Sequence, residues 1–145
     1  MSSLLLPIHL TFVGIWLGCV ITEALFERAL LGKGKEQELI LVALHKKVDL
    51  FVEIPAFVVV LVTGMLMLPF ANASGLFNTK VMFGLLAIFT NIYCVWLVFR
   101  RSTAANNGES EEFSRLDHKQ HKFGAIVLFS IIAALLIGLY THTAG

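Results

Sequence analysis

The stretch HKKVDLFVEIPA, residues 45–56, decides the fold because it places ionisable side chains at the start of an apolar segment that ends near residue 70. His45, Asp49 and Glu53 follow one another at intervals of four residues, so a helix carries all three on one face. Glu53 lies inside the apolar segment, about one helical turn past its start. An ionisable group at this depth is costly in hydrocarbon and normally faces a protein interior, a cavity or a partner. We therefore expect Glu53 to lie beside a cation or to relay protons, and to act in catalysis together with Asp49.

The composition is that of a membrane protein. Of the 145 residues, 57% are hydrophobic and 14% are charged, and the mean hydropathy is +0.82. Soluble domains carry charge on about a quarter of their residues. The length predicts a single domain over residues 1–145. The lipid bilayer is the expected partner, and a formal net charge of +1 argues against nucleic-acid binding.

Four apolar segments are long enough to cross a membrane. Each has about 20 residues, the length that a bilayer core requires, and none alternates as a strand would. The segments cover residues 4–24, 50–70, 81–99 and 123–141. The sequence therefore predicts an all-α protein, a bundle of four transmembrane helices in up-down-up-down order.

The connections between these segments differ in character. We expect Lys35 to begin a helical extension of the second segment, after a break at Gly32 and Gly34. Residues 71–75 are expected to form a short turn, and residues 102–112 a flexible polar loop. Within the second segment, Pro55 lacks a backbone donor, which predicts a kink beside Glu53.

The basic residues predict the orientation of the chain. The first and third connections each carry five lysines or arginines, whereas Lys80 is the only one elsewhere. The positive-inside rule then places these two connections in the cytoplasm and both termini outside it. We expect the protein in a bacterial inner membrane.

Histidines and carboxylates gather at the cytoplasmic level of the expected bundle. They are Glu23, Glu27, His45, Asp49, Glu53, Asp117, His118 and His121. Histidines on diagonal helices could hold a b-type haem between them, with His45 facing His118 or His121. The alternative is a non-haem divalent metal, because mixed imidazole and carboxylate ligands suit Fe, Mn or Zn. That metal set consists of Glu23, Glu27, His45, Asp49, Glu53, His118 and His121. A belt of solvated interfacial charges is the third interpretation.

The first segment carries a further histidine inside the membrane. His9 is followed after seven residues by Trp16, and then by Gly18. With Pro55-Ala56 and Thr63-Gly64 in the second segment and Lys80 before the third, this pattern resembles the small four-helix haem proteins of membranes. That superfamily includes the bacterial membrane protoporphyrinogen oxidase and the copper resistance protein D domain. The resemblance implies that His9 is a haem ligand.

Two main functions follow from these patterns. The first is a haem b protein, with axial ligands among His9, His45, His118 and His121, that transfers electrons or oxidises a quinone-like or porphyrin-like substrate. The second is a non-haem metal enzyme or transporter. A subunit without a cofactor is a third alternative, and self-association into a homo-oligomer is open. An oxidoreductase activity is therefore one expectation among several.

Overall fold

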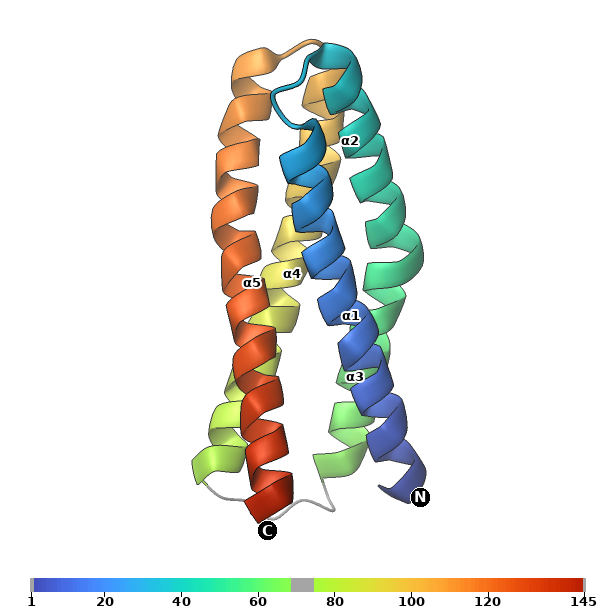
Figure 1. The fold of residues 1–145 in the computed structure, drawn as a ribbon, viewed down its shortest axis with the longest axis vertical. Helices are drawn as coiled ribbons and strands as arrows, with labels where there is room; N and C mark the ends of the chain where they lie inside the picture. Colours follow the sequence, from blue (N-terminus) through green and yellow to red (C-terminus); the bar gives the residue numbers. More distant parts are fainter. Residues whose placement is uncertain (1, 69–74, 145) are drawn as a thin grey trace.

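Four long helical spans form an antiparallel bundle (Figure 1). This computed structural model describes residues 2–68 and 75–144. The elements are α1 (Ser2–Leu30), α2 (Lys35–Val48), the π-helical turn η1 (Asp49–Glu53), α3 (Ile54–Met67), α4 (Gly75–Asn106) and α5 (Ser110–Ala144). Because α2, η1 and α3 follow one another without a break, they form a single second span. The predicted all-α four-helix bundle is confirmed.

All four spans are long and apolar enough to cross a membrane, so the chain is a multi-pass membrane protein. They are Leu4–Leu30, Lys35–Met67, Gly75–Asn106 and Ser110–Thr141, with 27 to 33 residues each. A hydrocarbon core needs only about 20 residues, so the spans reach beyond it. Large apolar side chains such as Phe51, Phe89 and Phe129 point outward and are 65–75% exposed, as a lipid-facing surface requires.

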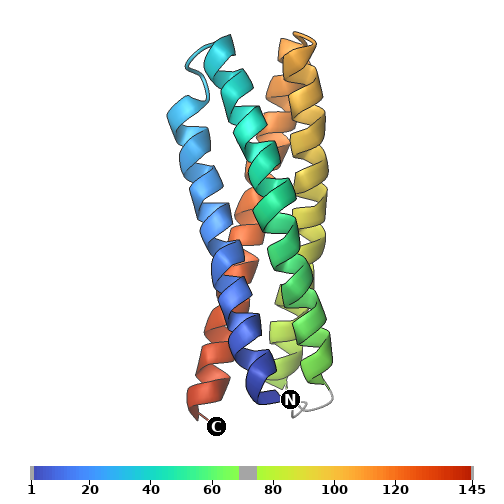
Figure 2. The same cartoon turned by 90° about the vertical axis from the view of Figure 1, so that its right-hand side faces the viewer.

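The spans pack in the predicted up-down-up-down order. Helix α4 lies along α5, α1 along α3, and α2 along α4 (Figures 1 and 2). The second and fourth spans are therefore diagonal to each other. Helix α1 begins and α5 ends at the same end of the bundle, at the bottom of Figure 1.

The break after α1 is confirmed, since Gly32 and Gly34 have φ values of 77° and 120° and α2 begins at Lys35. The predicted loop over residues 102–112 is wrong. Helix α4 continues to Asn106 and α5 already begins at Ser110, so residues 107–109 alone connect them.

Local chemistry explains this short connection between α4 and α5. Gly108 has a φ of 73°, which lets the chain turn sharply. Glu111 and Glu112 lie in the first turn of α5, where acidic side chains stabilise a helix. Residues 71–74 of the predicted second turn lie outside the described residues.

The irregularity predicted at Pro55 takes the form of the π-turn η1. The Ile54 N–H donates to the carbonyl of Asp49, five residues earlier, and the next residue, Pro55, has no donor to offer. In a regular α-helix, residues four apart drift by about 40° around the axis. A π-turn holds more residues per turn. It therefore keeps Glu53 closer to the face of His45 and Asp49.

Two apolar layers enclose the polar residues of the second span. One layer contains Ala56 and Phe57, which pack with Trp16, and the Trp16 indole donates to Asn91 Oδ1 over 2.9 Å. The other layer contains Val42 and packs around residues of α4 and α5. His45, Asp49 and Glu53 lie between Val42 and Ala56 in the chain, and all three are buried. The bundle thus seals a polar region between apolar ones.

Candidate metal centre

Ionisable and polar side chains from all four spans meet inside the bundle. Those that carry the argument are Glu23 and Glu27 of α1, His45 of α2, Asp49 and Glu53 of η1, Arg101 of α4, and Asp117 and Gln120 of α5, hereafter the polar cluster. All are buried except Asp117, which is half-buried. Buried charges are stable only when they are paired or bind a metal. Each charged side chain of the cluster should therefore have a partner of opposite charge or a metal ion.

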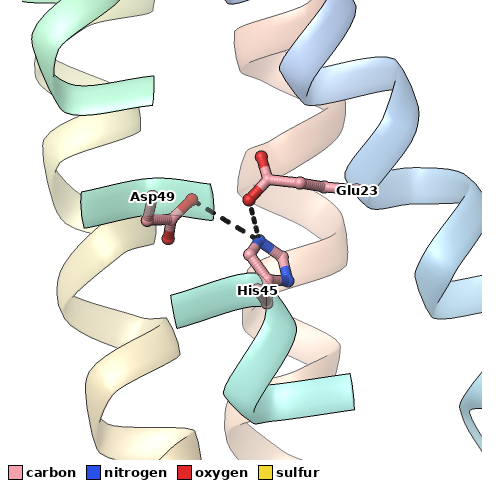
Figure 3. A group of neighbouring side chains, drawn as sticks. All are labelled: Glu23, His45 and Asp49. Carbon is pink, nitrogen blue, oxygen red and sulfur yellow. Dashed lines mark ion pairs between the residues drawn. The ribbon is translucent and has the colours of Figure 1, made fainter. Parts of the chain in front are cut away.

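His45 lies at the centre of the cluster (Figure 3). Its Nδ1 lies 2.9 Å from Glu27 Oε2 with hydrogen-bond geometry. Its Nε2 faces two other carboxylates, at 2.7 Å from Glu23 Oε2 and 3.9 Å from Asp49 Oδ1. A neutral imidazole donates from one nitrogen and accepts at the other. With Nδ1–H donating to Glu27, the Nε2 lone pair points to where Glu23 and Asp49 meet.

The oxygens of Glu23 and Asp49 on this side lack hydrogen-bond partners. Glu23 Oε2 and Asp49 Oδ1 are both buried without one, so the short contact to Nε2 lacks hydrogen-bond geometry. An unsatisfied buried carboxylate oxygen is costly. One ligand atom each from Glu23, His45 and Asp49 lies within 4.8 Å of the others. Two carboxylate oxygens without a donor thus converge on His45 Nε2, and this arrangement suits a cation.

Glu27 and Arg101 hold His45 in this orientation. Arg101 is fully buried and donates to both oxygens of Glu27, over 2.6 and 3.0 Å. A carboxylate that accepts the second ring N–H of a metal-binding histidine fixes its tautomer and orientation. Glu27 has this position relative to His45. Arg101 also donates to Asp117 over 3.0 Å, which ties α4 to α5.

Glu53 extends the acidic side of the cluster deeper into the bundle. It is 3% exposed, and its carboxyl group lies within hydrogen-bonding reach of that of Asp49. Four buried carboxyl groups, those of Glu23, Glu27, Asp49 and Glu53, thus face one guanidinium and one imidazole. A divalent cation would balance this excess of acid.

The other predicted histidines do not face His45, although His121 Nδ1 lies 3.2 Å from Asp117 Oδ1 at the edge of the cluster. His118 and His121 are exposed on α5, and the side chain that reaches His45 from α5 is Gln120, whose amide nitrogen lies 3.3 Å from Nε2. The diagonal histidine pair required for a haem at this level is therefore not formed. His9 is half-buried near the other end of the bundle, where its Nδ1 lies 2.8 Å from Thr63 Oγ1.

Arg101 and Gln120 belong to the cluster but are not among the site residues predicted from the sequence. Arg101 was counted only as a topology signal, although its helical spacing placed it on the core face. Asn91, Cys94 and Val98 precede it at intervals of three or four residues, and all are buried. Continuing that periodicity past the end of the apolar segment would have identified Arg101. No comparable signal marks Gln120.

No protein-family model matches the chain, and searches of curated proteins and of solved structures found no similar protein. The resemblance to small haem membrane proteins therefore stays a prediction. The geometry of the polar cluster alone carries the functional argument.

Proposed function

We propose that the protein binds one divalent transition-metal ion inside the bundle, through Glu23, His45 and Asp49. The observation that carries this proposal is the convergence of His45 Nε2 with two buried carboxylate oxygens that have no hydrogen-bond donor. A metal ion would satisfy both oxygens and would take the Nε2 lone pair in place of the Gln120 amide. Metal–ligand distances of about 2.1 Å allow ligand pairs up to about 4.2 Å apart. The present separations, within 4.8 Å, therefore require only small side-chain movements.

The donor set indicates the class of metal. One imidazole and two carboxylates form a nitrogen and oxygen site, which suits Mn²⁺, Fe²⁺ or Zn²⁺. Three protein ligands leave coordination positions open, as in catalytic metal sites. In an enzyme, water or a substrate would bind at those positions. In a transporter, incoming ligands would bind there as the ion leaves the site. The site thus supports a metal-dependent enzyme or a metal transporter of the membrane.

A haem b centre has less support at this level of the bundle. Both ring nitrogens of His45 already face carboxylates, and neither His118 nor His121 points a buried nitrogen toward it. His9 remains the histidine that a haem would use according to the resemblance. An optical spectrum of the reduced protein separates the two functions, because haem b has sharp absorption bands and a non-haem site has none.

We place the metal site at the cytoplasmic side of a bacterial inner membrane. This orientation follows from the basic residues of the first and third connections. These connections lie at the end of the bundle nearer the polar cluster, at the top of Figure 1. An ion would therefore reach the site from the cytoplasm.

Metal analysis of purified variants tests the proposal. The wild-type protein, loaded with Mn²⁺ and passed over a desalting column, is expected to retain about one ion per chain. His45→Gln removes the central ligand and should abolish retention. His118→Gln is the matched control, since His118 is an exposed histidine outside the site. Equal retention by wild type and His45→Gln would disprove the proposal.

A further inference from the structure

A second set of potential metal ligands joins two members of the polar cluster to the exposed His121. Glu27, Asp117 and His121 offer one ligand atom each, and these atoms lie within 4.8 Å of one another. The sets are built alike. Each has one glutamate of α1, and each adds a histidine and an aspartate four residues apart, His45 and Asp49 in one and Asp117 and His121 in the other.

The two sets touch through Glu27. Its Oε2 lies 2.9 Å from His45 Nδ1, on the side of the ring opposite the proposed ligand atom. The distance between the sets is thus one imidazole ring. Four-helix bundles that hold two metal ions use pairs of carboxylates and histidines from facing helices in a related way. The donor atoms alone would allow a second ion here.

A positive side chain already occupies the second set. The Arg101 guanidinium lies against Glu27 at 2.6 and 3.0 Å and against Asp117 at 3.0 Å. Arg101 has no exposed surface, and its Nε has no hydrogen-bond partner. Arg101 is therefore held by charge attraction to the two carboxylates, although its hydrogen bonds are incomplete. Its planar fork is suited to carboxylates in a way that a lysine ammonium is not.

We propose that Arg101 is a built-in cation which fills the second ligand set, so that the protein takes one divalent ion instead of two. This inference rests on the proposed function for the identity of the first site. A guanidinium between Glu27 and Asp117 neutralises the charge that a metal would need there and repels a divalent ion. Arg101 thereby determines the specificity of the cluster for a single ion.

A titration of metal-free protein with Mn²⁺, read by the electron paramagnetic resonance of the free ion, counts the bound equivalents. Wild type is expected to bind one equivalent and Arg101→Gln two. Arg100→Gln is the matched control, because Arg100 is the neighbouring arginine but is exposed and pairs with Glu112. It should bind one equivalent. Adding His121→Ala to Arg101→Gln should return the count to one.

The same titration separates the failure of this inference from the failure of the proposed function. The wild-type count tests the first site, whereas the difference between Arg101→Gln and wild type tests the role of Arg101. An unchanged count in Arg101→Gln overturns the inference. If that variant does not fold, Arg101→Lys decides. The single ammonium of the lysine cannot hold both carboxylates. A second equivalent of Mn²⁺ should therefore bind at higher Mn²⁺ concentration. If no second equivalent binds, the inference is overturned as well.

Discussion

At the residue scale, Glu27 links the proposed metal to the rest of the cluster. It accepts from His45 and from Arg101, so Glu27→Gln weakens both contacts. Loss of a carboxylate that orients a metal-binding histidine typically lowers metal affinity about 10- to 100-fold. We expect a loss in this range, measured by Mn²⁺ titration. Glu36→Gln changes an exposed glutamate at the start of α2 and should leave the affinity unaltered. A Glu27→Gln variant with wild-type affinity would refute the orienting role.

Glu53 contributes charge rather than a ligand atom. It is buried beside Asp49, and a cation bound at the site would favour its ionised form and gain affinity from that charge. Glu53→Gln preserves the size of the side chain, so the fold should persist. The Mn²⁺ affinity should fall by about tenfold or more, which corresponds to about 1.4 kcal/mol. If circular dichroism and metal affinity both match wild type, Glu53 has no part in the centre.

At the scale of single residues, the sequence predicts which side chains share a helical face but not how they pair between helices. The four-residue intervals between His45, Asp49 and Glu53 predicted that all three share one helical face. In the structure all three are buried in one cluster. Which ring nitrogen faces which carboxylate was not readable, because that depends on the rotation and distance of α1 relative to α2. The guanidinium of Arg101 could not be matched to Glu27 and Asp117 for the same reason, since each pair depends on how two separate helices are rotated against each other.

At the element scale, the π-turn η1 positions Glu53 and α3 relative to Asp49, whereas Asp49 follows His45 in regular α-helical geometry. Pro55 favours this turn because it cannot donate the α-helical hydrogen bond to the carbonyl of Phe51. Pro55→Ala restores that donor, so the turn should revert to α-helix and rotate Glu53 and α3 relative to His45 and Asp49 by tens of degrees. We expect the Mn²⁺ affinity to drop about tenfold, as when a side chain that supports a metal ligand is displaced.

Thermal unfolding provides the control for this substitution. Pro55→Ala removes a poor helix former from a helix, so the melting temperature should stay level or rise while metal affinity falls. Pro7→Ala makes the same exchange within α1, away from the cluster, and should leave metal affinity unchanged. Higher stability with full affinity in Pro55→Ala would show that η1 does not position the site.

The elements themselves were largely predictable, since apolar length identifies spans well. The error lay between α4 and α5, where composition suggested a loop over residues 102–112. Polar residues with good helix propensity continue a helix beyond the membrane when a neighbouring span supports it. Phe113 and Leu116, buried against Leu97 and Ala104, supply that support. Contacts of this kind between two helices are not visible in local composition.

At the scale of the whole molecule, the orientation decides which compartment supplies the metal. Reporter domains fused after Gly145 test it. A periplasm-active reporter should function there and a cytoplasm-active one should not, because the basic connections are expected inside. The opposite pattern would place the metal site on the outer side of the membrane and remove the cytoplasm as its source.

The central claim is that an ion binds between α1 and the second span, at Glu23, His45 and Asp49. The most direct test is an anomalous difference map from crystals of the protein grown with Zn²⁺ and measured at the zinc absorption edge. The account predicts one strong peak at about 2.0–2.2 Å from His45 Nε2 and from oxygens of Glu23 and Asp49. A map with no peak there, or with zinc only at the exposed His118 and His121, would contradict it.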